Sequence, residues 1–477
     1  MIIIKLNDLN YRYDVYHIFK LFYDYDKIDF KEENYDFIVD ITPKEIKFVN
    51  KKNETSKFQF EGKLKFKEEL KKFMYIYLSN LTYKKLPWGI LIGIRPTKIV
   101  HQMMDKGLDE SEIIEALNKN YFLAEDKAKL CIQVANMERK HVNKNPKIIS
   151  VYVGMPFCPT RCLYCSFASN PINSCKKLVE PYLRALEYEI RRVSEFINRK
   201  NLEIECVYFG GGTPTSLEDN EFQSILFKVY ENFVKGRKVK EFNVECGRPD
   251  SINENKLLSM KKCEVNRISI NPQSMNDDTL KAIGRNHKAK DIIEKFNLAR
   301  SLGFDNINMD LIIGLPNEGL EEVRKTCEEI LKLNPDSITV HGMAIKRGSI
   351  LHEQILLGEM KLIEQFELDS MYNETVKLAE KLKMKPYYMY RQKNMIGNTE
   401  NVGYSKLSKE GLYNIQMIEE KQTIIALGAD AVTKAVFLET DRIERVGNLK
   451  DIKEYINRLE EKIQEKLNVL ETIYDQN

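Results

Sequence analysis

The sequence predicts an α/β fold: a partial (β/α)6 TIM-like barrel, preceded by an α+β module and followed by a C-terminal segment that passes from α/β to helical structure. From about residue 147, six short runs rich in apolar and β-branched residues alternate with charged stretches of helical periodicity. This alternation indicates successive βα units and a parallel sheet. Because crossovers between parallel strands are right-handed, the six units are expected to curl into a barrel with helices outside.

Residues 1–145 are predicted to form a separate N-terminal α+β accessory domain. The run "FIVDITPKEIKFV" (37–49) combines strand-like apolar residues with a proline break, and "LDESEIIEALNKNYF" (108–122) has the periodicity of a helix. The segment "LPWGILIGIRPTKIV" (86–100) contains the single tryptophan, Trp88, and indicates packing at a seam between domains more than a docking surface.

Residues 146–348 are predicted to form the barrel, with motifs that carry polar residues at the C-terminal ends of its strands. The βα loops of such a barrel bring their residues together on one rim. The six predicted strands are "KIISVYVGM" (147–155), "IECVYFGGG" (204–212), "EFNVEC" (241–246), "RISINPQ" (267–273), "INMDLIIGL" (307–315) and "SITVHGMAI" (337–345).

Residues 349–477 are predicted to form a C-terminal domain on the substrate side. It contains a polar and aromatic segment, "KPYYMYRQKNMIGNTENVGYS" (385–405), and a turn of small residues, "IIALGADAV" (424–432). Residues 449–473 are expected to form one amphipathic helix, whose apolar stripe is Ile452, Ile456, Leu459, Ile463, Leu467 and Leu470.

Composition and charge exclude several classes of function. The 74 Lys and Arg residues nearly balance the 71 Asp and Glu residues, and no polybasic stripe indicates a nucleic-acid partner. The apolar start "MIII" is too short for a signal-peptide core, and no run approaches the roughly eighteen apolar residues of a membrane span. A soluble cytoplasmic protein without a membrane partner is expected.

Three of the nine cysteines, Cys158, Cys162 and Cys165, lie close together in "GMPFCPTRCLYCSF" (154–167). Cytosolic thiols are kept reduced, so such a cluster indicates metal binding or catalysis. Thiolates spaced Cys-x3-Cys-x2-Cys in one loop can hold three irons of a cubic iron-sulfur cluster and leave the fourth iron without a protein ligand. Structural zinc and a redox dithiol are the alternatives, but zinc would require a fourth Cys or His nearby.

The cysteine motif, with Tyr164 before its last cysteine, resembles that of the radical S-adenosylmethionine (SAM) enzymes. The series "YVGMPFC", "FGGGTPT", "VEC", "RISINPQS", "IGRNH", "MDLIIGLP" and "ALGADAV" is similar to their coproporphyrinogen dehydrogenase branch over about residues 147–435. The segments "LPWGILIGIRPTK", "HGMAIKRGS" and "YRQKNMIGNTENVGY" resemble its HemZ-type group. The resemblance implies a [4Fe-4S] cluster on Cys158, Cys162 and Cys165 and one or two bound molecules of SAM.

The resemblance also implies which residues contact SAM. Glycines permit close backbone approach to its amino-acid part, carboxylates suit ribose hydroxyls or an ammonium, and arginine offers a fork to a carboxylate. The implied contacts are Tyr152, Tyr164, Gly211, Gly212, Thr213, Glu245, Gln273, Arg285, Asp310, Ala344 and Val432. Of these, Tyr152, Glu245 and Arg285 are the expected catalytic residues.

The implied activity is oxidative decarboxylation of coproporphyrinogen III propionates to vinyl groups, giving protoporphyrinogen IX through a 5′-deoxyadenosyl radical. A reducing electron donor of the flavodoxin or ferredoxin class is the implied partner. Gly154 stands where the best-known enzymes carry a histidine, and Phe167 where they carry a fourth cysteine. A haem chaperone and a haem-modifying or haem-degrading radical SAM protein are therefore the alternatives.

A tetrapyrrole with four carboxylates requires cationic contacts. Four basic residues outside the SAM set lie in segments expected to cap the barrel rim, and surface salt bridges are the alternative role for each of them. These candidates are Lys346, Arg347, Arg391 and Lys393.

Overall fold

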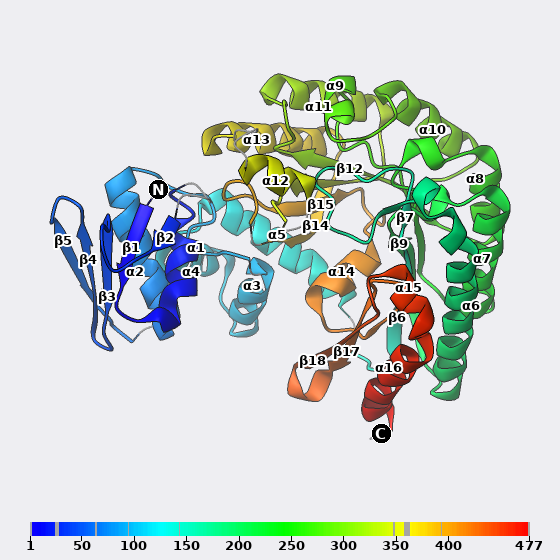
Figure 1. The fold of residues 1–477 in the computed structure, drawn as a ribbon, viewed down its shortest axis with the longest axis horizontal. Coiled ribbons are helices and arrows are strands. Elements are labelled where there is room, and N and C mark those ends of the chain that lie inside the picture. Colours follow the sequence, from blue (N-terminus) through cyan, green and yellow to red (C-terminus); the bar gives the residue numbers. More distant parts are fainter. Residues whose placement is uncertain are drawn as a thin grey trace. The chain divides into compact units, whose positions relative to one another are not determined.

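A computed structural model describes residues 2–23, 28–62, 64–93, 95–142, 144–346, 349–356, 363–392 and 394–475 (Figure 1). Its contacts divide the chain into two compact units. Unit 1 is Met1–Gln133 together with Arg391–Glu400, and unit 2 is Val134–Tyr390 together with Asn401–Asn477. The division into three domains at residues 145 and 348 stays a prediction.

Unit 1 contains a five-stranded sheet in the order β2-β1-β3-β4-β5. Strand β1 pairs in parallel with β2 and β3, and β3, β4 and β5 follow one another in antiparallel pairs. The strands are β1 (Ile2–Leu6), β2 (Ile28–Phe30), β3 (Phe37–Ile41), β4 (Glu45–Asn50) and β5 (Thr55–Gln59). The helices are α1 (Arg12–Phe19), α2 (Phe66–Thr82), α3 (Pro96–Asp105) and α4 (Glu110–Tyr121), while α5 (Glu125–His141) continues into unit 2.

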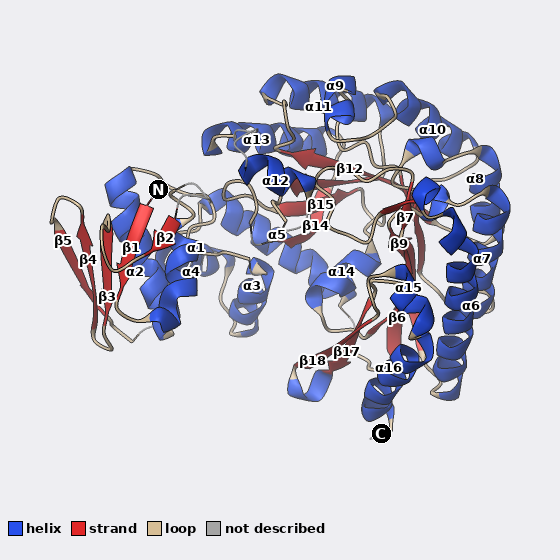
Figure 2. Ribbon diagram, viewed as in Figure 1, coloured by secondary structure: helices blue, strands red, loops and turns tan. Residues whose placement is uncertain are grey.

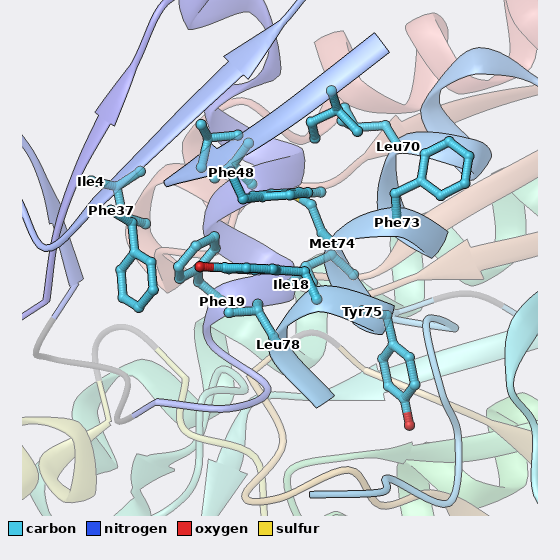
Figure 3. Close-up of a cluster of buried hydrophobic side chains, with 14 of the residues drawn as sticks. Ile4, Ile18, Phe19, Phe37, Phe48, Leu70, Phe73, Met74, Tyr75 and Leu78 are labelled. Carbon is cyan, nitrogen blue, oxygen red and sulfur yellow. The ribbon is translucent and has the colours of Figure 1, made fainter. Parts of the chain in front are cut away.

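The core of unit 1 forms because alternate residues of β3 and β4 point to one face of the sheet. Phe48 of β4 stacks on Tyr77 of α2 with ring centroids 4.5 Å apart and planes 7° from parallel. Phe37 of β3 meets Phe19 of α1 edge to face at 5.3 Å (Figure 3). The predicted strand-rich run 37–49 is thus a β-hairpin, and the helix predicted at 108–122 is confirmed as α4.

Unit 2 contains an eleven-stranded sheet in which the six predicted strands run parallel to one another, and β16 (Ile424–Leu427) adds a seventh parallel strand beside the first of them. The six are β6 (Ile148–Met155), β9 (Glu203–Gly211), β10 (Glu241–Glu245), β11 (Arg267–Ser269), β12 (Ile307–Ile313) and β13 (Ser337–Gly342). The intervening helices form an outer layer around this curved sheet (Figure 2). They are α6 (Lys176–Arg199), α7 (Asp219–Phe233), α8 (Glu254–Lys262), α9 (Asp277–Ala282), α10 (Ala289–Ser301) and α11 (Leu320–Leu333).

Both edges of the parallel sheet are extended by strands from the C-terminal part of the chain. Beside β13 lie the antiparallel strands β15 (Asn401–Ser405) and β14 (Lys385–Tyr390), so the polar and aromatic segment is largely a hairpin. Beside β6 lies β16 (Ile424–Leu427), followed by β17 (Val432–Phe437) and β18 (Arg442–Gly447). The segment predicted as a turn at 424–432 therefore begins with a strand, because its four residues "IIAL" pair with β6 and are buried.

The remaining helices of unit 2 are α12 (Ile350–Leu356), α13 (Gln365–Lys381), α14 (Leu412–Glu419), α15 (Ile452–Asn457) and α16 (Leu459–Tyr474). The prediction of a single helix at 449–473 is wrong, because the backbone leaves the helical conformation at Arg458 (φ −111°, ψ 22°) and separates α15 from α16. No helix in the described part of the chain is long and apolar enough to span a membrane.

Helix α14 is fixed to the start of strand β10. Leu412 N donates to Glu241 Oε2 at 2.7 Å, so a strand carboxylate caps the N-terminus of this helix. Glu241 begins β10, whereas Glu245 ends it. Helix α14 therefore closes the N-terminal end of the barrel and leaves the C-terminal rim for the βα loops.

Candidate active site

The three clustered cysteines lie in the loop that follows β6. Cys158 ends the short strand β7 (Phe157–Cys158), which pairs with β8 (Asn170–Pro171) beyond the loop. The loop rests on the turn after α9, because Leu163 N donates to Ile283 O at 3.1 Å and Thr160 Oγ1 to Gly284 O at 2.9 Å. Gly284 has φ +78°, and a Cβ there would lie 3.3 Å from Arg161 O, so this turn favours glycine.

The thiols of this loop influence one another. Burial raises the pKa of Cys158 to about 12, a hydrogen bond from Thr213 opposes this shift, and the neighbouring Cys165 and Cys162 add to it. Cys162 and Cys165 are partly exposed. Because ligating thiols must lose their protons, binding of an iron cluster has to offset the burial of Cys158.

Two glycines let the ends of β6 and β9 meet. Gly212 N donates to Met155 O at 2.6 Å and Thr213 N to Phe157 O at 2.7 Å. A Cβ on Gly212 would lie 2.5 Å from Phe157 O and 3.1 Å from Cys158 Sγ. Gly211 has φ +101°, and a Cβ there would lie 3.0 Å from Tyr152 Oη. Larger residues would therefore displace the cysteine loop or Tyr152.

Two carboxyl groups of the barrel, Glu245 at the end of β10 and Asp310 within β12, have opposite pKa shifts. Burial, and then the charge of Asp310, raise the pKa of Glu245 to about 7, although Tyr208 hydrogen-bonds it at 3.3 Å. Burial also acts to raise the pKa of Asp310, but the nearby His341 and a hydrogen bond from Asn308 outweigh it and lower that pKa. Asn308 Nδ2 lies 2.7 Å from Asp310 Oδ1, and His341 Nε2 lies 3.9 Å from Asp310 Oδ2. Near neutral pH the site thus combines one ionised and one partly protonated carboxyl group.

Gln273 and Arg285 present buried polar atoms that no described residue satisfies. Gln273 has φ +66°, and its backbone N–H donates to Asp310 O at 2.9 Å. Arg285 Nη1 donates to Asn271 O at 2.5 Å, and its Nη2 lies 3.5 Å from Tyr164 Oη. Gln273 Oε1 and Arg285 Nε have no hydrogen-bond partner within the described ranges. A bound polar ligand would satisfy both atoms.

Aromatic side chains line the interior below these groups. Tyr208 of β9 stacks on Tyr413 of α14 at 4.5 Å and on Tyr152 of β6 at 5.9 Å between ring centroids. The predicted Tyr152 therefore lies between the glycine turn at Gly211 and this aromatic stack.

These features fit the [4Fe-4S] cluster and SAM that the sequence predicts. The loop offers three thiols, glycine backbone lies beside them, and unsatisfied polar atoms and carboxyl groups follow in the later βα units. Ala344 lies just after β13 and Val432 begins β17. The individual ligand contacts of all these residues stay predictions.

The candidate substrate contacts have different surroundings. Lys346 Nζ lies 5.1 Å from the ring centroid of Phe167, which is 60% exposed beside the cysteine loop. Arg391 is instead buried within unit 1, where its guanidinium lies 4.9 Å from the ring of Trp88 and its Nε donates to Thr399 O at 2.8 Å. These contacts favour a structural role for Arg391. Arg347 and Lys393 lie outside the described residues.

The sequence interpretation missed Arg248 and Asp250, which lie beside the cysteine loop. Arg248 Nη1 donates to Thr160 Oγ1 at 2.9 Å and lies 3.9 Å from Cys162 Sγ. Its Nε and Nη2 donate to the two carboxylate oxygens of Asp250 at 3.0 and 2.8 Å. Both residues follow Glu245 in "VECGRPD", so their place in the loop after β10 was the available signal.

Comparison with known proteins supports the assignment of the cysteine loop and barrel to the radical SAM enzymes. The model of the radical SAM superfamily matches residues 152–330. The chain is 38% identical over 440 residues to the oxygen-independent coproporphyrinogen-III oxidase-like protein HemZ of Bacillus subtilis, covering 90% of this chain and 87% of that protein. It is 32% identical over 223 residues to the haem chaperone HemW of the same organism, covering 47% and 58%.

The fold also resembles a solved structure. Coproporphyrinogen III oxidase (HemN) from Escherichia coli superposes with a TM-score of 0.54 at 22% identity, covering 69% of this chain and 73% of that chain. This likeness confirms the α/β barrel class.

Proposed function

The chain belongs to the radical SAM family of HemZ-type, oxygen-independent coproporphyrinogen-III oxidase-like proteins, and on that premise we propose that it oxidatively decarboxylates propionate groups of coproporphyrinogen III to vinyl groups. Proteins of this family use a [4Fe-4S] cluster and SAM. The product of two such decarboxylations is protoporphyrinogen IX. The proposed partner is a reducing electron donor of the flavodoxin or ferredoxin class.

The observation that carries the proposal is the meeting of the cysteine loop with the glycine turn after β9. Cys158, Cys162 and Cys165 would hold the cluster, while Gly211 and Gly212 keep the adjoining backbone free of side chains. When bound, the cluster and SAM together supply a reducing electron and an organic radical able to remove a hydrogen atom from a substrate.

The other polar residues of the site bind and orient SAM and the substrate. Ionised Asp310 can accept hydrogen bonds from hydroxyl groups, and the guanidinium of Arg285 provides a cation for a carboxylate. Glu245, whose pKa burial raises to about 7, can hold or release a proton at its carboxyl oxygens near neutral pH. The rings of Tyr152, Tyr208 and Tyr413 fill the barrel interior and exclude water from beneath these groups.

Lys346 is the substrate contact that the described structure supports best. It follows β13 at the rim, beside Phe167 and the cysteine loop. Burial lowers the pKa of its ammonium group because it disfavours the charged form. A carboxylate bound beside Lys346 would stabilise that charged form. A propionate of the tetrapyrrole is the proposed occupant.

The test is an anaerobic reaction of reconstituted, chemically reduced protein with SAM and coproporphyrinogen III, followed by mass spectrometry of porphyrins and nucleosides. We expect 5′-deoxyadenosine together with porphyrin that has lost carbon dioxide. Cys162→Ala should abolish both products, whereas Cys175→Ala, a matched cysteine outside the triad, should retain them.

Two other outcomes would contradict the decarboxylase proposal. Altered haem accompanied by SAM cleavage would indicate a haem-modifying enzyme. Stoichiometric haem uptake and transfer without substrate-stimulated SAM cleavage would indicate a chaperone, the role that the name of the relative HemW gives to that protein.

A further inference from the structure

Arg248 brings a buried positive charge to one cysteine of the triad. Its side chain is 3% exposed and leaves the loop after β10 to reach the cysteine loop. Nη1 donates to Thr160 Oγ1 at 2.9 Å and approaches Cys162 Sγ at 3.9 Å, within the range of a hydrogen bond to sulfur.

Asp250 fixes the direction of this guanidinium. Its two carboxylate oxygens receive Nε and Nη2 of Arg248, the paired geometry that orients arginine most firmly. His287 Nδ1 lies 3.6 Å from Asp250 Oδ1. Burial acts to raise the pKa of Asp250, but His287 and Arg248 together hold it below its ordinary value, so the carboxylate is ionised. Asp250 therefore fixes the Nε and Nη2 atoms of the guanidinium, and Nη1 is the nitrogen that faces the cysteine loop.

We propose that Arg248 tunes the reduction potential of the iron-sulfur cluster by donating a charge-assisted hydrogen bond to the sulfur of Cys162. Hydrogen bonds to cysteine sulfurs and nearby charge set the potentials of such clusters. Reduction adds negative charge to the cluster, so a cation at a ligating sulfur stabilises the reduced form and raises the potential. The inference rests on the cluster of the proposed function and is independent of the tetrapyrrole.

A purely structural role is the competing explanation, because Arg248 also holds Thr160. The two roles predict different results in variants of three residues. Arg248→Met removes the donor to sulfur and keeps an apolar stem of similar length. Thr160→Val removes the hydroxyl contacts to Arg248 and Gly284 but keeps the guanidinium beside Cys162. Asp250→Asn keeps the size of the side chain and one acceptor for Arg248, and it removes the negative charge that partly neutralises the guanidinium.

The experiment is a redox titration of each reconstituted protein, followed by electron paramagnetic resonance of the reduced cluster, without SAM or tetrapyrrole. Iron content per chain normalises the signals. For Arg248→Met we expect the equilibrium constant of one-electron reduction to fall about tenfold, which is about 59 mV lower in potential. Thr160→Val should keep the potential of the unmutated protein even where it lowers iron content, and Asp250→Asn should raise the potential.

The opposite signs expected for Arg248→Met and Asp250→Asn make the proposal falsifiable even if one variant fails to load its cluster. An Arg248→Met protein with full iron content and unchanged potential would overturn it. An unchanged or lowered potential in Asp250→Asn would overturn it as well, whether or not Arg248→Met can be measured. Neither result depends on whether coproporphyrinogen III is the substrate.

Discussion

Trp88 Nε1 donates a 2.6 Å hydrogen bond to Glu400 Oε2, and this bond ties the segment Arg391–Glu400 to the rest of unit 1. Lys127 Nζ binds the other oxygen of Glu400 at 2.6 Å, and Trp88 N donates to Asn398 Oδ1 at 2.6 Å. The segment joins strands β14 and β15 of unit 2. The connection between two barrel-edge strands is thus folded into the N-terminal unit.

Trp88→Phe should loosen this segment, because phenylalanine keeps only a smaller aromatic ring and removes the indole N–H. Losing a buried hydrogen bond to a charged group is expected to lower the free energy of unfolding by about 1–3 kcal/mol. Urea unfolding would measure that loss, and amide hydrogen exchange of residues 391–400 would locate it. Tyr83→Phe, at a side chain that is 92% exposed, is the control. Unchanged exchange in residues 391–400 of Trp88→Phe would contradict the assigned role.

Glu189 and Lys466 form an ion pair that is fully removed from solvent. The carboxylate of Glu189 also receives Gly428 N at 2.8 Å and Tyr455 Oη at 2.7 Å, so α6 holds the turn after β16 and the C-terminal helices together. Burial acts to raise the pKa of Glu189, but the charge and hydrogen bond of Lys466 outweigh it and lower that pKa.

Lys466→Met should be strongly destabilising, because it leaves a buried carboxylate without its cation. A loss of about 3–5 kcal/mol in the free energy of unfolding is expected, and Glu189→Gln combined with Lys466→Met should recover much of it. Because the pKa of Glu189 is lowered by folding, its contribution to stability is present above pH 4.5 and is lost as the pH falls below that value. Chemical unfolding at pH 7 and pH 4 measures both effects. Equal stability of Lys466→Met and the unmutated protein at pH 7 would contradict the assigned role of the ion pair.

The sequence predicted the parts of the fold that depend on local pattern. The six parallel strands were found because each apolar run is separated from the next by a helix-periodic stretch. The cysteine loop was found because its three thiols lie close together in the chain.

Parts that depend on distant partners were missed. The residues of β16 pair with β6, far earlier in the chain, and no local pattern distinguishes that strand from a turn. Arg391 was expected at the substrate because of its charge, yet its guanidinium lies against Trp88 in unit 1. Arg248 reaches Cys162 only through the packing of two βα loops, which sequence spacing does not reveal.

Glu245 predicts a pH-dependent stability that its amide variant should lack. The pKa of Glu245 is raised from 4.5 to about 7, so its contribution to stability is fully present below pH 4.5 and is lost as the pH rises through 7. Relative to the unmutated protein, Glu245→Gln should therefore gain about 2 kcal/mol between pH 5 and pH 8, measured by urea unfolding of the cofactor-free protein. In Asp310→Asn, which removes a charge that raises the pKa of Glu245, the loss should end at a lower pH and be smaller in total. A constant difference between Glu245→Gln and the unmutated protein across this range would contradict the shift.

The cysteine site has no room for a side chain at Gly212. A Cβ added to Gly212 would lie 2.5 Å from Phe157 O, a separation that real Cβ atoms do not show. The same Cβ would lie 3.1 Å from Cys158 Sγ. Gly212→Ala should therefore displace β7, lower the free energy of unfolding by about 1–3 kcal/mol and reduce the iron bound per chain after reconstitution. Gly247→Ala is the matched control, because a Cβ there would meet Asn271 Nδ2 at an ordinary 3.6 Å. Iron analysis and thermal unfolding of the two variants would separate a local steric effect from a general intolerance of alanine at the rim. If Gly212→Ala binds iron as well as Gly247→Ala does, the close approach of β6 and β9 is not what shapes the cluster site.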